Sequence, residues 1–137
     1  MQALLLDTCA VVWIAEGEKL ARPALDILDA AAGENVTTYI SPISAWEVGR
    51  LAARNRLQLL ITPQRWFRRL LETPNVQLAE MSPELLIESS FLPGVPPRDP
   101  ADRIIAATAR DYGATLVTRD RALLEYGEQG HVRVVEC

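Results

Sequence analysis

Short apolar segments typical of β-strands alternate with segments of helical spacing along this 137-residue chain. Residues 3–6 form the first apolar segment, and apolar residues recur at helical spacing over residues 20–32 before Gly33. Parallel strands need such a helix between them, and strands that are apolar throughout belong in a sheet covered on both faces. The alternation therefore predicts an α/β fold, with a central parallel sheet and helices on both sides.

Strands and helices continue to alternate to the end of the chain. Further strands are expected at residues 36–40, 76–79, 114–118 and 132–135. Helices are expected to begin at four pairs in which proline follows a capping residue: Ser41-Pro42, Thr62-Pro63, Ser82-Pro83 and Asp99-Pro100. The last two helices should end near Gly113 and Tyr126, and the proline-rich residues 92–97 should form an ordered loop. With no linker or repeat in the sequence, residues 1–137 are expected to form one domain.

Four acidic residues stand directly after predicted strands or in the helices that follow them: Asp7, Glu47, Asp102 and Asp120. In doubly wound sheets, ligands bind beyond the carboxyl ends of the strands, so these side chains are expected to share one site. Carboxylates brought together in a partly desolvated pocket repel one another unless they protonate or bind a cation. Oxygen ligands favour a hard divalent ion, and we therefore predict a Mg²⁺ or Mn²⁺ site.

The rest of the sequence favours phosphodiester hydrolysis at that metal site over other chemistry. His131 is the only histidine, which excludes a ribonuclease that uses two histidines as acid and base. There is no nucleophilic serine motif and no glycine-rich phosphate loop. The two cysteines, Cys9 and Cys137, do not have the spacing of a zinc site or of a disulfide framework.

Each acidic residue also has a purely structural interpretation. Asp7 and Asp120 have the position of helix N-caps, and Asp102 has that of a first-turn acid that complements the helix dipole. Glu47 lies among apolar neighbours, where it needs either a metal or a partner such as Arg50, one turn further on. Their shared position at the strand ends is what favours a common site.

Some neighbouring residues are expected to support the ligands or the core. We expect Asp99 to cap its helix beside the ligand Asp102, and the hydroxyls of Thr8 and Thr118 to orient carboxylates. The three tryptophans are expected to be core residues: Trp13, Trp46 and Trp66.

Charge and hydropathy limit the partners of the protein. The net charge of −4 argues weakly against nucleic acid, but residues 50–69 carry six arginines and no acidic residue. This stretch is expected to face either phosphates or an acidic protein partner. Apolar runs are too short to span a membrane, and the N-terminus lacks a basic leader segment, so a soluble cytoplasmic protein is predicted.

Four segments together resemble the PIN-domain ribonucleases, and specifically the VapC toxins of bacterial type II toxin-antitoxin systems. They are residues 5–8 with Trp13, then residues 41–48, 98–107 and 115–120, in the order that the family has them. Cys9 and Pro97 depart from the pattern, because close relatives often have histidine at both positions. The resemblance implies a single PIN-like domain over residues 1–137.

The resemblance also implies a function. Such a protein is an endoribonuclease dependent on Mg²⁺ or Mn²⁺, is silenced by an antitoxin of the VapB group, and commonly forms a homodimer. The family's acidic ligands fall on the four carboxylates chosen above. Arginines near the site then become candidates for contact with RNA or antitoxin: Arg50, Arg54, Arg56 and Arg98.

Two alternatives from other classes share an acidic pocket or an α/β scaffold. A receiver-like phospho-acceptor domain would need a lysine after a late strand, and Lys19, the only lysine, comes early in the chain. A non-cleaving RNA-binding domain would bind RNA without metal-dependent cleavage.

Overall fold

The computed structural model describes residues 2–137, and within this range five strands form one sheet in which all neighbours are parallel. The strand order is β3-β2-β1-β4-β5. The strands are β1 (Leu4–Leu6), β2 (Thr38–Ile40), β3 (Val76–Leu78), β4 (Thr115–Thr118) and β5 (Arg133–Glu136). Leu5 of β1 lies opposite Tyr39 of β2 and Leu116 of β4, which aligns the carboxyl ends of the three central strands.

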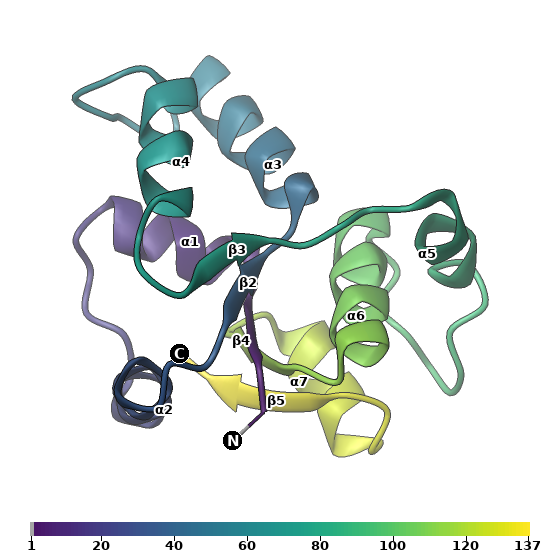
Figure 1. The fold of residues 1–137 in the computed structure, drawn as a ribbon. Coiled ribbons are helices and arrows are strands. Elements are labelled where there is room, and N and C mark those ends of the chain that lie inside the picture. The colour runs from purple at the N-terminus through teal and green to yellow at the C-terminus, as the bar shows by residue number, and fades with distance from the viewer. Residues whose placement is uncertain (1) are drawn as a thin grey trace.

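Seven helices connect these strands in the described part of the chain. They are α1 (Thr8–Ala15), α2 (Arg22–Gly33), α3 (Pro42–Ala53), α4 (Pro63–Leu71), α5 (Pro83–Glu88), α6 (Pro100–Tyr112) and α7 (Arg121–Glu128). Figure 1 shows α1 to α4 on one side of the sheet and α5 to α7 on the other. The predicted α/β fold with helices on both faces is therefore confirmed.

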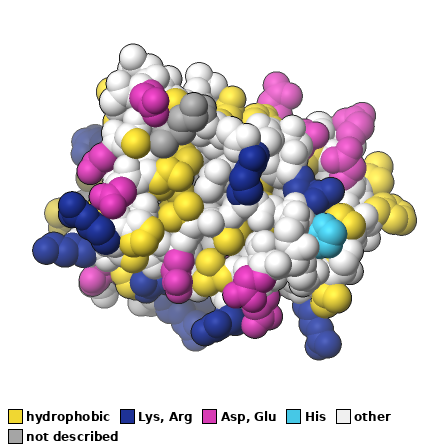
Figure 2. Space-filling model, turned by 90° about the horizontal axis from the view of Figure 1, so that it is seen from below, with side chains coloured by type: hydrophobic (Ala, Val, Ile, Leu, Met, Phe, Trp, Pro, Cys, Tyr) yellow, Lys and Arg dark blue, Asp and Glu magenta, His cyan; other side chains and the backbone are white. Residues whose placement is uncertain are grey.

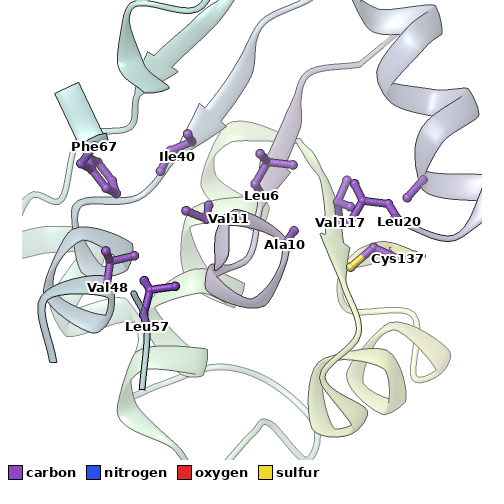
Figure 3. Packing of buried hydrophobic residues seen from close by; sticks show 11 residues of the cluster. Leu6, Ala10, Val11, Leu20, Ile40, Val48, Leu57, Phe67, Val117 and Cys137 are labelled. Carbon is purple, nitrogen blue, oxygen red and sulfur yellow. The ribbon is translucent and has the colours of Figure 1, made fainter. Parts of the chain in front are cut away.

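Two apolar cores lie on the two faces of the sheet. Successive residues of a strand point to opposite faces, and accordingly Leu6 belongs to one core and Leu5 to the other. Helices α1, α2, α3 and α4 contribute to the first core, where Figure 3 shows Val11 beside Leu6. Helices α6 and α7 contribute to the second core, where Tyr126 is fully buried. This packing on both faces fixes the central strands and the residues at their ends.

Helix starts agree with the predicted capping pairs. Ser41, Thr62, Ser82 and Asp99 each accept a hydrogen bond from a backbone amide at the start of their helix, and proline occupies the first turn each time. Gly113 ends α6 in the left-handed conformation. Helix α1 was implied only by the N-cap position of Asp7 and its bounds were not predicted, because its strongly apolar sequence has no polar face to give it helical periodicity.

The edges of the sheet depart from the prediction that the strands are buried throughout. Leu78 of β3 is 48% exposed, and both ends of β5 are exposed, because these outer strands have a neighbour on one side only. Trp46 is 54% exposed, so its prediction as a core residue is wrong, whereas Trp13 and Trp66 pack against the first core. No helix in residues 2–137 is long and apolar enough to cross a membrane.

Charged side chains of both signs are interspersed on the face that Figure 2 shows. Apolar side chains lie between them, and neither sign forms a continuous patch on that face. Carboxylates are instead concentrated at the carboxyl ends of the central strands.

Candidate active site

Asp7 lies at the carboxyl end of β1, in the middle of the sheet. Its amide donates to the carbonyl of Val117 in β4, and its side chain is only 3% exposed. The carboxylate caps α1 by accepting a 2.8 Å hydrogen bond from the amide of Thr8. The local sequence thus places a charged group where a buried strand becomes a helix.

Two further groups donate to the carboxylate of Asp7. The hydroxyl of Thr118 donates to Oδ2 at 2.7 Å, and the thiol of Cys9 donates to the same oxygen at 3.3 Å. The hydroxyl oxygen of Thr118 also accepts a 3.0 Å hydrogen bond from the amide of Asp120. Thr118 therefore contacts two of the predicted ligands through one hydroxyl group.

Glu47 reaches the same region from α3. The hydroxyl of Thr8 donates to its Oε1 at 2.6 Å and lies 2.8 Å from the hydroxyl of Ser44, one turn earlier in α3. Arg50 does not form an ion pair with Glu47 within 4.0 Å, and its guanidinium lies over the ring of Trp46 instead, 4.7 Å from the centroid. Ser44 is fully buried and lies in the motif of residues 41–48, but it was not among the predicted site residues.

Asp99 and Asp102 enter the site from the start of α6. The carboxylate of Asp99 accepts a 2.8 Å hydrogen bond from the amide of Ala101, which is the predicted cap. Asp102 stands three residues later, in the first turn of the same helix. Arg103 holds this helix start in place by donating to the backbone carbonyls of Ser89 and Pro97.

A single pocket of about 420 Å³ unites these residues. Its charged walls come from the four predicted ligands together with Asp99 and Arg119, and its apolar wall from Val12, Trp13 and Leu51; Thr8 and Cys9 complete the lining. Asp7 and Asp120 cap α1 and α7 and also line the pocket, so the capping role does not exclude a functional one.

Burial, and to a smaller extent the neighbouring carboxylates, raises the pKa of Asp7, Glu47 and Asp102. Burial and the neighbouring carboxylates, led by Asp120, raise the pKa of Asp102 to about 8. Burial is also the main cause that raises the pKa of Asp7, where the bonds from Thr118, Cys9 and Thr8 act in the opposite direction. Such mutual repulsion is what a bound cation relieves.

Glu47 follows the same trend. Burial raises its pKa, while the hydroxyl bond from Thr8 and the charge of Arg50 lower it. The thiol of Cys9 is not poised as a nucleophile, because its contact with Cys137 and its burial raise its pKa. Both cysteines are free thiols.

The donor set fits a hard divalent ion held partly by water. All four predicted ligands offer carboxylate oxygens, the donors that Mg²⁺ and Mn²⁺ prefer. Within residues 2–137, no three His, Cys, Asp or Glu side chains stand close enough to enclose an ion by themselves. Mg²⁺ normally keeps several water ligands, so an open carboxylate pocket agrees with such an ion better than with a closed cage of zinc type.

The arginine stretch begins beside this pocket. Arg50, Arg54 and Arg56 line a smaller recess of about 120 Å³ that also contains Glu47. Arg98 is exposed on the loop before Asp99.

Arg119 lines the carboxylate pocket itself, although it was not among the predicted site residues. Its position between Thr118 and Asp120, two predicted site residues, was the signal available in the sequence.

The chain is similar to proteins of known family and structure. A model of the PIN domain family matches residues 4–129. Ribonuclease VapC22 of Mycobacterium tuberculosis is 36% identical over 124 residues, which cover 90% of this chain and 91% of that protein.

Two solved structures share the fold at lower identity. One is VapBC2 from Rickettsia felis bound to a DNA fragment from its promoter, with a TM-score of 0.64, 17% identity and 98% of both chains covered. The other is FitAcB from Neisseria gonorrhoeae, with a TM-score of 0.55, 22% identity, and 96% of this chain and 95% of that one covered.

Proposed function

The chain belongs to the PIN domain family, and from this premise we propose that it is a metal-dependent endoribonuclease acting as the toxin of a type II toxin-antitoxin pair. The observation that carries the proposal is the pocket lined by Asp7, Glu47, Asp102 and Asp120. The relative VapC22, a ribonuclease by name, supports RNA as the substrate. The sequence motifs also resemble those of this family. Neither the motifs nor the family match supports the receiver-like alternative.

The four carboxylates are proposed as the ligands of one or more Mg²⁺ or Mn²⁺ ions. When bound, such an ion supplies Lewis acidity toward the phosphate and lowers the pKa of a coordinated water. Asp7 is prevented from turning by the bonds from Thr118 and Thr8, and Glu47 by its bond from Thr8. Holding the ligands in advance in this way reduces the reorganisation needed when RNA arrives.

The apolar wall of the pocket complements the charged one. Val12, Trp13 and Leu51 line the same pocket as the carboxylates. Fewer water molecules compete near an apolar wall, which strengthens the electrostatic interactions between the carboxylates and a phosphate-bound cation. The same wall offers apolar contact to a ribose or base.

The proposed partners follow from the same assignment. The structural likeness to VapBC2 and FitAcB supports a VapB-type antitoxin as the partner of this chain. A homodimer and a cytoplasmic location are proposed with it. Arg50, Arg54, Arg56 and Arg98 are proposed to contact either the RNA backbone or the antitoxin.

A cleavage assay on total RNA tests the enzymatic part of the proposal. The purified chain should cleave RNA with Mg²⁺ or Mn²⁺, lose that activity with EDTA, and regain it when excess metal is added back. RNA binding without metal-dependent cleavage would support the non-cleaving RNA-binding alternative instead.

A growth assay tests the toxin role separately. Expression of the chain should arrest bacterial growth, and co-expression of a small DNA-binding protein encoded immediately upstream should relieve the arrest. If the nuclease is shown to be expressed and active and growth is still unchanged, the toxin role is contradicted. The nuclease assignment would not be affected.

A further inference from the structure

Arg119 is the only cationic residue that lines the carboxylate pocket as defined over residues 2–137. It follows β4 directly and stands between Thr118, which bonds Asp7, and the predicted ligand Asp120. Its amide donates to the sulfur of Cys9 at 3.4 Å, so its backbone is tied to α1. The sheet thus brings one arginine to the pocket that the four predicted ligands line.

The guanidinium of Arg119 is held on two sides. It stacks over the ring of Trp13, with Cζ 3.2 Å from the ring centroid. Its Nε and Nη2 donate to the backbone carbonyl of Cys137 at 3.1 Å and 2.9 Å. An arginine is a long side chain with much rotamer freedom, and these contacts remove most of it before any ligand binds.

No Asp or Glu side chain of residues 2–137 forms an ion pair with this guanidinium. The one ion pair given for Asp and Glu side chains in that range joins Arg22 and Asp26 on the exposed surface of α2. Nη1 of Arg119 has no hydrogen-bond partner among residues 2–137, and the residue is exposed to solvent. A positioned cation with free N–H groups beside an acidic pocket is therefore available to a second, anionic group.

The chemistry of RNA supplies that group. Each nucleotide carries a phosphate, and guanidinium N–H groups match phosphate oxygens in geometry and charge. Carboxylates repel an RNA strand, and a cation at the rim of the pocket would offset that repulsion as the strand approaches. Resting on the proposed function, we infer that Arg119 binds a phosphate of the RNA strand at the rim of the carboxylate pocket, with Trp13 and the Cys137 carbonyl fixing its position.

A purely structural role makes a different prediction. If Arg119 served only to hold Cys137 against α1, its loss would lower the melting temperature without changing the affinity of the enzyme for RNA. Steady-state cleavage separates the two roles, because loss of a phosphate contact raises KM and weakens the salt dependence of kcat/KM.

The test compares Arg119→Gln, Arg119→Lys and the control Arg22→Gln, which makes the same change in net charge on an exposed surface. Cleavage of a short single-stranded RNA with Mn²⁺ is measured from about 50 to 200 mM salt. For Arg119→Gln, we expect KM to rise roughly tenfold, and the slope of log kcat/KM against log salt to become shallower by about 0.7, as for one lost phosphate contact. Arg119→Lys keeps the positive charge and should retain most of the salt slope of the wild type. Arg22→Gln should have the KM and the salt slope of the wild type.

An unchanged KM and salt slope in a folded Arg119→Gln would overturn the inference while wild-type cleavage still upheld the proposed function. Absence of cleavage by the wild type would contradict both. If Arg119→Gln does not fold, chemical modification of arginines by phenylglyoxal tests the inference instead. The experiment uses the Asp102→Asn protein, which is expected to leave the RNA uncleaved. RNA should protect Arg119 from modification and leave Arg22 reactive. Equal modification of Arg119 with and without RNA would contradict the inference.

Discussion

The hydroxyl of Thr118 donates a 2.7 Å hydrogen bond to Oδ2 of Asp7, joining residues that are 111 positions apart in the sequence. Both are buried at the carboxyl ends of neighbouring parallel strands, β4 and β1. The same hydroxyl oxygen accepts a hydrogen bond from the amide of Asp120, so one side chain sets the relation between two proposed ligands. The geometry of the site thus depends on the register of the sheet.

Thr118→Val tests this relation with a side chain of nearly the same shape. The variant leaves Oδ2 of the buried Asp7 without its shortest hydrogen bond, and we expect a loss of about 1–3 kcal/mol in the free energy of unfolding. Because partners that orient metal ligands typically contribute about 10–100-fold, cleavage should fall by roughly that factor. Thr118→Ser keeps the hydroxyl and should stay within a few-fold of wild type; equal losses in both variants would assign the effect to packing rather than to the hydrogen bond.

The stability of the metal-free protein should depend on pH through Asp102. Its pKa is raised from 3.8 to about 8 in the folded state, so the folded protein holds a proton that the unfolded chain releases within this window. The contribution of this group to stability should therefore be largest below about pH 4 and decrease as the pH rises toward 8. The raised pKa values of Asp7 and Glu47 act in the same direction.

Asp102→Asn removes the titrating group, so in EDTA its melting temperature should exceed that of the wild type at about pH 8 and approach it at about pH 4. Mn²⁺ should stabilise the wild type more at about pH 8 than at about pH 5. Thermal unfolding followed by circular dichroism measures both effects. A wild type that is more stable than Asp102→Asn near pH 8 without metal would show that its neighbours do not destabilise the charged carboxylate.

The loop before α6 is fixed by a close approach at Gly94. Gly94 has a φ of +68°, and a Cβ there would come within 2.4 Å of Nε2 of His131. Tyr126 and Gln129 also hold this loop, through the carbonyl of Pro93 and the backbone of Val95. The loop leads directly to Asp99 and Asp102, so its position matters for the site.

Gly94→Ala should be more destabilising than Gly17→Ala, which has a similar φ of +71° but no atom within 4 Å of the place that the added methyl group would occupy. Both variants bear the cost of a left-handed alanine, about 1–2 kcal/mol, and only Gly94→Ala adds the clash. Denaturant unfolding of the two variants measures the difference. Equal losses would mean that His131 moves aside at no cost.

Much of this structure could be predicted from the sequence, because the relevant signals are local. Proline after Ser, Thr or Asp marked four helix starts, and the apolar segments marked all five strands of the sheet described over residues 2–137. The acidic residues after those strands could be grouped because a parallel sheet aligns its carboxyl ends. The pocket that Asp7, Glu47, Asp102 and Asp120 line follows from that topology.

Other features depend on tertiary contacts that the sequence does not encode locally. Helix α1 lacks amphipathic spacing because nearly all of its residues are apolar, and Trp46 is exposed with its ring beside the guanidinium of Arg50. The support from Ser44 and the position of Arg119 arise from residues brought together across the sheet. None of these contacts has a periodicity to reveal it.

The proposed function depends on four specific carboxylates acting together in one metal-dependent reaction. Single-turnover cleavage of RNA with Mn²⁺ tests this most directly, using Asp7→Asn, Glu47→Gln, Asp102→Asn and Asp120→Asn beside Asp99→Asn, in which asparagine still caps α6. We predict a loss of at least about 100-fold for each of the four in folded protein, and a change below about tenfold for Asp99→Asn. Undiminished cleavage by both Asp7→Asn and Asp102→Asn, or a loss in Asp99→Asn as large as theirs, would contradict this assignment.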